Sequence, residues 1–229
     1  MKKKNLLVIA LLGVLTVGTI GGAYAYFTNV SQRVDNNFTF VTGGGPEDVG
    51  EVKEPGWEEI PEDDKKNLQP NATLVKDPQF MSNSDYPSYV YLEVTLPTAT
   101  QADEDNSNII IGQIQPDGDI QDVTATKGTE LVILNTDESN NKWTRLGKKE
   151  EDGKVTYLYG YSDIVAPKAT TQPVFNSFTV PNFKKYKGTT ALNISVISRA
   201  IQAEGNKAND FENYATLFGA DAAGFTAIN

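Results

Sequence analysis

The sequence contains no cysteine and no histidine. Without cysteine the chain has neither a disulfide nor a thiolate nucleophile. Without histidine it lacks the usual general base near neutral pH and the commonest zinc ligand. Protease triads built on histidine and the HExxH zinc motif are therefore excluded. Glycoside hydrolysis by paired carboxylates and a calcium site made only of oxygen ligands remain compatible with the composition.

Basic residues are also scarce, with 20 Lys and Arg against 30 Asp and Glu and a formal net charge of −10. Three of the lysines are Lys2, Lys3 and Lys4 at the very start of the chain. A body this acidic is repelled by the phosphate backbone and by anionic membrane surfaces. We therefore expect no nucleic-acid partner.

Charge is absent from Leu6–Ile20, which follows the basic start and is strongly apolar. Ala23 and Ala25 then supply small residues at the −3 and −1 positions of a cleavage site. A basic head, an apolar middle and a small-residue end are the three parts of a secretory signal peptide. The sequence predicts a signal peptide over 1–25 and a mature chain that begins at Tyr26.

A retained transmembrane helix is the alternative, since Leu6–Ala25 just reaches the ~20 apolar residues that a span needs. Gly13, Gly18 and the Gly21–Gly22 pair weaken a helix, and the pair suits an extended cleavage segment. Cleavage is the interpretation we favour. It predicts a secreted or cell-surface protein that contacts a membrane only before it is cut.

The segment 26–42 shows period-two alternation, the pattern of a half-buried strand. Sixteen extended residues span roughly 50 Å, whereas a strand of a compact domain usually has ~5–6 residues. Such a strand pairs either within its own domain or with the sheet of a neighbouring molecule, and the pattern leaves both open. The residues expected to carry assembly are Tyr26, Phe27, Val30, Val34, Phe38 and Phe40.

The rest of the chain divides into an acidic Gly/Pro-rich loop region over 43–70 and a β domain over 71–229. Trp57 indicates that part of the loop region packs against something. The strand-like runs are Ala72–Met81, Ser88–Pro97, Asn108–Gln115, Thr129–Asn135, Lys154–Ser162, Gln172–Pro181 and Thr190–Ala203. Polar turns separate these runs, a pattern typical of a β-sandwich or jelly roll.

One helix is expected near the C-terminus. Apolar residues recur there at helical spacing from Phe211 to Phe218. Asn209 or Asp210 is expected to cap the helix and Gly219 to end it. The predicted fold class is therefore mainly β, a jelly-roll-like β-sandwich with a short C-terminal helix, preceded by a signal peptide and an N-terminal strand.

Several segments, in order, resemble the TasA/camelysin family of exported Gram-positive proteins with a SipW-type signal peptide. They are "AYAYFTNVSQRVDNNFTFVTG" at 23–43, "VKEPGWEE" at 52–59, "LVKDPQFMSNSDYPSYVYLEVTLP" at 74–97, "YLYGYSDIVAPKATTQPVFNSFTVPNF" at 157–183 and "VISRAIQAEG" at 196–205. The resemblance implies a jelly-roll core and a biofilm matrix fibre subunit. It also implies a dedicated SipW-type signal peptidase as a partner and an accessory matrix or anchoring protein.

Acidic turns are the only candidates for metal chemistry. The residues at which calcium would bind are Asp103, Asp105, Asp117 and Asp119, but neither turn has the full calcium-loop spacing. Solvated turns are the interpretation we favour, so no cofactor and no catalytic residue is assigned. Tyrosines such as Tyr89, Tyr91 and Tyr157 fit strand packing better than a sugar-binding face.

Three functional hypotheses follow. The first is a non-enzymatic secreted subunit of an extracellular fibre, a head-to-tail homopolymer made by donor-strand complementation. The second is a camelysin-like cell-surface metallopeptidase, against which the missing histidine and cysteine count. The third is a monomeric cell-surface module that binds glycan or protein.

Overall fold

A computed structural model describes residues 50–65, 68–136, 141–187, 192–204 and 210–228, and the backbone of 28–30. Within these residues the protein is mainly β, with 45% strand and 13% helix, and a short helix lies near the C-terminus. The predicted mainly-β class and the C-terminal helix are therefore confirmed. Within the same residues, no helix is both long enough and apolar enough to cross a membrane.

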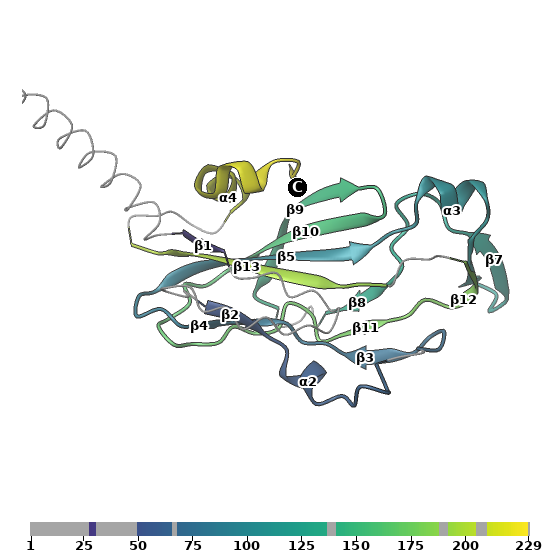
Figure 1. The fold of residues 1–229 in the computed structure, drawn as a ribbon, viewed down its shortest axis with the longest axis horizontal. Coiled ribbons are helices and arrows are strands. Elements are labelled where there is room, and N and C mark those ends of the chain that lie inside the picture. Colours follow the sequence, from purple (N-terminus) through teal and green to yellow (C-terminus); the bar gives the residue numbers. More distant parts are fainter. Residues whose placement is uncertain are drawn as a thin grey trace, which may run out of the picture.

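The largest sheet has the strand order β1–β13–β5–β10–β9–β14, and its neighbouring strands are antiparallel (Figure 1). The strands span Thr28–Val30 (β1), Ser195–Gln202 (β13), Ser88–Pro97 (β5), Lys154–Tyr161 (β10), Trp143–Glu151 (β9) and Thr226–Ala227 (β14). We call it the main sheet. It contains β5, β10 and β13, which fall within three of the strand-like runs predicted from the sequence.

Two small sheets form a second layer against one face of the main sheet (Figure 1). One pairs β2 (Gly50–Lys53) with β4 (Gln79–Ser82), and the other has the order β3–β11–β8. The strands of the second span Thr73–Val75 (β3), Ser177–Thr179 (β11) and Ile133–Asn135 (β8).

The largest apolar cluster lies between these layers. Val94 and Val196 from the main sheet are fully buried in it, and Phe80 and Phe178 enter from the second layer. Because side chains alternate along a strand, each strand sends every second residue into this cluster. Burial of this apolar area is the main force that holds the layers together.

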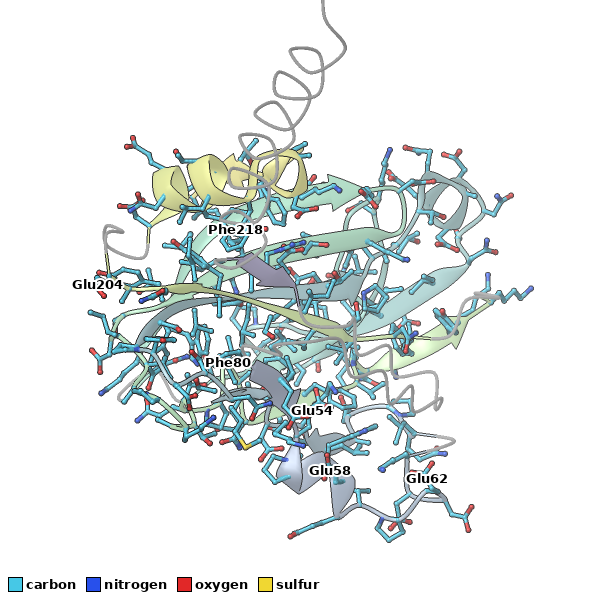
Figure 2. All side chains as sticks on the ribbon, turned by 60° about the vertical axis from the view of Figure 1, so that its left-hand side comes forward. Glu54, Glu58, Glu62, Phe80, Glu204 and Phe218 are labelled. Atoms are coloured by element: carbon cyan, nitrogen blue, oxygen red, sulfur yellow. The ribbon has the colours of Figure 1, made fainter. Side chains whose placement is uncertain are left out.

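The opposite face of the main sheet is covered by helix α4 (Phe211–Phe218), as Figure 1 and Figure 2 show. Tyr91 and Leu158 from the sheet pack there against Tyr214 and Phe218 of the helix. Both faces of β5 are thus covered, which explains why its apolar residues are almost completely buried. In Figure 2, Phe218 and Phe80 lie on opposite sides of the main sheet.

A fourth sheet lies beyond the end of β5, with the order β12–β6–β7. It comprises β12 (Phe183–Tyr186), β6 (Ile109–Ile114) and β7 (Ile120–Thr124). Helix α3 (Gln101–Asp105) connects the main sheet to it and begins with a capping box between Thr100 and Asp103. This helix was not predicted from the sequence.

Two sequence expectations change at the level of local structure. The run Ala72–Met81 is two strands, β3 and β4, because Pro78 lies between them and has no N–H for a ladder. The region 43–70 is not only loop, since β2 joins a sheet and helix α2 (Pro55–Glu58) follows it. Trp57 of this helix packs on the main apolar cluster, which confirms that it is packed.

Candidate functional site at the edge of the main sheet

The N-terminal strand β1 occupies an edge position of the main sheet. It pairs antiparallel with β13, so that Thr28 lies opposite Ile201, Asn29 opposite Ala200 and Val30 opposite Arg199. On its other side β13 pairs with β5 along its whole length, from Ser195 to Gln202. The N-terminal segment therefore adds to a sheet whose next strands are held together independently of it.

The strand β13 that receives β1 is anchored on both faces. Val196 and Ala200 point into the main apolar cluster and are nearly fully buried. Arg199 points to the opposite face, where its Nε donates to Glu93 of β5 at 2.5 Å. Its Nη1 donates to Asp221 at 2.9 Å, in the short 3-10 turn that follows α4. Side chains on both faces therefore fix the position of this strand.

Tyr214 of α4 completes the polar network beneath the edge. Its hydroxyl donates to the same Glu93 oxygen that accepts from Arg199. Desolvation by burial, and then the negative charge of Glu93, raise the pKa of Tyr214 above its ordinary value. The phenol therefore stays neutral and donating, and the helix is joined to β5 and β13 by hydrogen bonds as well as by apolar packing.

Helix α4 forms as its sequence predicts. The Asp210 side chain accepts from the Asn213 backbone N–H at 2.8 Å and caps the N-terminus. Gly219 ends the helix with a φ of 46°, a conformation that glycine adopts readily. The expected cap and the expected stop are both confirmed.

Only one of the predicted assembly residues lies within the described residues. Val30 is in β1, at the register position opposite Arg199. The others, Tyr26, Phe27, Val34, Phe38 and Phe40, lie outside the described residues, as do the cleavage-site residues Ala23 and Ala25.

The four aspartates considered for calcium are divided between two elements. Asp103 accepts from the Thr100 backbone N–H and hydroxyl in the capping box, and Asp105 accepts from the Gln101 amide. Asp117 accepts from the Asp119 backbone N–H in the turn between β6 and β7. Over the described ranges, no group of three or more Asp and Glu residues is placed to hold a metal ion.

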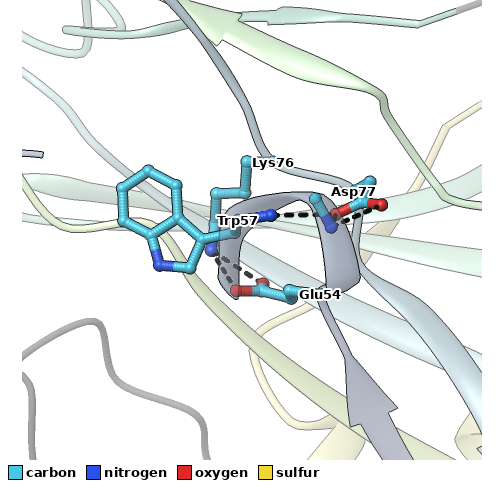
Figure 3. A network of polar contacts seen from close by, with 5 residues as sticks. Glu54, Trp57, Lys76 and Asp77 are labelled. Carbon is cyan, nitrogen blue, oxygen red and sulfur yellow. Dashed lines mark hydrogen bonds and ion pairs between the residues drawn. The ribbon is translucent and has the colours of Figure 1, made fainter. Parts of the chain in front are cut away.

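A second buried polar network lies in the other layer and was not foreseen from the sequence (Figure 3). The Lys76 Nζ donates to both carboxylate oxygens of Glu54, at 2.6 and 2.7 Å, and lies 5.0 Å from the centre of the Trp57 ring. Asp77 accepts from the backbone N–H groups of Gly56 and Trp57. Desolvation by burial lowers the pKa of Lys76, and the charge of Glu54 opposes that shift.

These contacts fasten α2 to the segment that follows β3. The sequence carries one signal for them, a tryptophan in an acidic Gly/Pro-rich stretch, and none for the pairing of Lys76 with Glu54 across 22 positions. The ion pair in this network is closed to solvent, because Lys76 is only 1% exposed and Glu54 6%. It therefore holds structure together and offers no open site to a ligand.

The tyrosines on the main sheet are used mainly for packing. Tyr91 packs against α4, and Tyr161 packs against Trp143 with ring centroids 4.8 Å apart. Tyr157 donates its hydroxyl to Glu130, and the Arg145 guanidinium stacks 4.1 Å from the centre of its ring. The preference for packing over a sugar-binding face agrees with these contacts.

Comparison with known proteins gives no further assignment. No protein-family model, no curated protein and no solved structure matches this chain.

Proposed function

We propose that the mature protein is a secreted structural subunit of an extracellular biofilm matrix fibre, assembled by donor-strand complementation after signal peptide cleavage. The single observation that carries the proposal is the edge position of β1 beside β13. The sequence resemblance to the TasA/camelysin family supports it, as does the alternating apolar pattern of 26–42.

An edge strand can be exchanged between identical molecules. The place next to β13 offers backbone hydrogen bonds to any strand of matching sequence, and a neighbour's N-terminal strand has that sequence. The main sheet keeps its β13–β5–β10–β9 pairings whichever molecule supplies β1. The exchange therefore replaces one set of edge contacts by an equivalent set.

The chain between β1 and the body is long enough for exchange. Residues 31–49 separate β1 from β2, and a chain of this length reaches at most roughly 65 Å when extended. Each subunit would donate its strand to one neighbour and accept a strand from another. That contact is heterologous and does not close, so it builds a filament.

Cleavage provides the switch in this proposal. A strand still joined to the signal peptide stays at the membrane, whereas a cut after Ala25 frees Tyr26 as the first residue of the strand. A SipW-type signal peptidase is the partner that performs the cut, and an accessory matrix or anchoring protein attaches the fibre. The proposal extends the observed two-layer β architecture to a jelly roll and gives the protein no catalytic role.

Electron microscopy of the mature chain tests the proposal. Protein beginning at Tyr26 is expected to form filaments, and protein lacking 26–40 is expected to stay monomeric. A matched pair separates an effect on the strand from an effect of added charge. Replacing Val30 and Val34 by Asp should abolish filaments, whereas replacing Ile114 and Ile120 by Asp adds the same charge at exposed positions outside the strand and should leave them.

Two results would contradict the proposal. Filaments from the chain lacking 26–40 would show that another surface polymerises. A mature protein that stays monomeric at high concentration and binds cell-wall glycan would favour the surface-module alternative. Casein cleavage that a chelator abolishes, in a preparation free of contaminating protease, would favour the peptidase alternative.

A further inference from the structure

The main sheet has two edges, and different segments of the chain cover them. One edge is β13, which receives β1. The other is β9, a strand of nine residues, against eight in β13. An open edge of that length offers backbone N–H and C=O groups to any extended chain. The cover on β9 therefore decides how many strands one subunit accepts.

The middle of β9 is covered by β14, and Figure 1 shows the C-terminal end of the chain beside β9. Thr226 lies opposite Lys148, and its hydroxyl donates to the Lys148 backbone oxygen at 3.2 Å. The Ile228 backbone N–H donates to the Leu146 backbone oxygen at 2.9 Å. Because hydrogen-bonded positions alternate along an antiparallel ladder, Thr226 and Ile228 bond to β9 and the Ala227 N–H points away. We call Thr226, Ala227 and Ile228 the edge cover.

A glycine in β9 and an aromatic residue before β14 hold the edge cover in place. A Cβ at Gly147 would lie 2.9 Å from the Thr226 backbone oxygen and 2.9 Å from Cε2 of Phe211, so only glycine allows this approach. Phe225 directly precedes β14, and its ring centroid lies 6.0 Å from that of Tyr214 in α4. Packing on the helix therefore anchors the edge cover as well as the ladder does.

The two ends of β9 are protected in other ways. At one end the Trp143 backbone N–H donates to Oδ1 of Asn141 at 2.9 Å, which leaves it unavailable to an incoming strand. At the other end Lys148–Glu151 reads "KKEE", and its side chains form two ion pairs along the strand. The pairing of β9 with β10 also shifts register between Leu158 and Tyr159. Charges and irregularities of this kind discourage strand addition at an edge.

The edge at β13 has none of these protections within the described residues. Its one charged residue, Arg199, is 6% exposed and bonded to Glu93. In the part of the chain that the structure describes, β1 is the only strand on its outer side. The two edges of one sheet thus differ, and only β13 is suited to receive a strand from another molecule.

The number of accepting edges sets the form of a strand-exchange polymer. Each mature chain has one N-terminal strand to donate. With one accepting edge per subunit, the heterologous contact builds an unbranched filament. Strand addition relies mainly on backbone hydrogen bonds, so an uncovered β9 would receive the same donor strand. A subunit would then bind two donors, and the filament would branch.

We propose that the edge cover closes β9 to the N-terminal strand of a neighbour and so restricts strand exchange to β13. This inference rests on the proposed function and names the element that regulates its acceptor site. The edge cover acts by occupying the backbone groups of β9. It takes no part in donating or accepting the exchanged strand.

Paired proline substitutions test the edge cover. Thr226→Pro/Ile228→Pro removes the two N–H groups that bond to β9, whereas Ala227→Pro removes one that points away. Electron microscopy of the mature chain should show unbranched filaments for the wild type and for Ala227→Pro. The double variant should give branched filaments. Unbranched filaments from the double variant would contradict the inference.

A binding experiment separates this inference from the proposed function. The mature chain lacking 26–40 has no strand of its own for β13, which still pairs with β5 along its whole length. A synthetic peptide of residues 26–40 is the probe, and native mass spectrometry counts the peptides bound. We expect one peptide on the wild-type sequence and on Ala227→Pro, and two on Thr226→Pro/Ile228→Pro. Counts of none, none and one would refute exchange at β13 and support the edge cover.

The same peptide count for the double variant and the wild type would overturn the inference. A second peptide on Ala227→Pro would also overturn it, because that variant keeps the ladder to β9. Cooperative urea unfolding checks that each variant is folded. If the double variant does not fold, Ile228→Pro alone removes one bond at the end of the edge cover and should bind a second peptide on part of the molecules. Its failure to do so would equally overturn the inference.

Discussion

Lys76 and Glu54 form an ion pair in the interior of the protein, with the Lys76 Nζ 2.6 and 2.7 Å from the two carboxylate oxygens. Lys76 directly follows β3, and Glu54 directly precedes α2. The pair therefore joins the short helix to the β3–β11–β8 sheet. Figure 3 shows the Trp57 ring beside the ammonium group, which adds a cation–π contact.

Removing one partner of this pair should destabilise the fold strongly. Lys76→Met leaves the Glu54 carboxylate buried without its cation, and we expect a loss of about 3–5 kcal/mol in the free energy of unfolding. The double variant Lys76→Met/Glu54→Leu buries no charge there and should recover most of that loss. Urea unfolding followed by tryptophan fluorescence measures both.

An exposed ion pair provides the control for Lys76. Lys142 and Asp163 are in contact at 2.5 Å, but both side chains are about half exposed. Lys142→Met should leave the urea midpoint nearly unchanged, because solvent screens such pairs. A Lys76→Met variant with an equally unchanged midpoint would show that the buried pair adds nothing to stability.

The polar network of Glu93, Arg199 and Tyr214 should make the free energy of unfolding fall at alkaline pH. Tyr214 has a pKa raised above its ordinary 10.0 by burial and by the charge of Glu93. Above pH 10 the unfolded chain loses this proton while the folded protein keeps it, so stability is lost as the pH rises. Below pH 10 the contribution is fully present.

Tyr214→Phe isolates that effect. The variant should be less stable at neutral pH by about 1–3 kcal/mol, because Glu93 loses a buried donor. Its stability should then fall less steeply than that of the wild type above pH 10, since one titrating group is gone. Urea midpoints from pH 7 to about 11 give both slopes. Parallel slopes for the two proteins would refute the role of Tyr214.

Gly147 lies where β9 approaches both α4 and β14. A Cβ added there would be 2.9 Å from Cε2 of Phe211 and 2.9 Å from the backbone oxygen of Thr226. Gly147→Ala should therefore push the helix and the last strand outward, at a cost of about 1–3 kcal/mol. Thr144→Ala, at an exposed position of the same strand, is the control and should change the urea midpoint little.

Strands with an apolar face could be predicted from the sequence. In β5, Val90, Leu92 and Val94 alternate in the sequence and are fully buried in the structure. Helix α4 was predictable for a similar reason, because its apolar spacing, its cap residue and its terminal glycine all indicate one helix. In both cases local pattern and tertiary burial agree.

Strands that form because a neighbouring strand pairs with them could not be predicted from the sequence. β9 contains "TRLGKKEE" and has no continuous apolar face, yet it is a strand because β10 pairs with it along nearly its whole length. The Lys76–Glu54 pair joins residues 22 positions apart, and neither residue type indicates burial. The edge position of β1 could likewise not be predicted. The alternation in 26–42 indicates a strand but does not indicate which strand of the sheet it pairs with.

The register of β1 offers a way to decide which molecule supplies the strand. Asn29 and Ala200 are opposite each other, and the chain has no cysteine of its own. In the Asn29→Cys/Ala200→Cys variant, oxidation of freshly purified monomers should close a disulfide within one chain and trap β1 in its own sheet. Trapped protein should not polymerise, and reduction should restore filament formation.

Oxidation of the same variant after assembly should give the opposite pattern. If neighbours exchange strands, the disulfide then links successive subunits, and denaturing gels under non-reducing conditions should show a ladder of covalent multimers. Each single-cysteine variant should give no more than a dimer, because one thiol cannot propagate a chain. Filaments whose disulfides are all within single chains would show that β1 stays in its own sheet and that other contacts build the fibre.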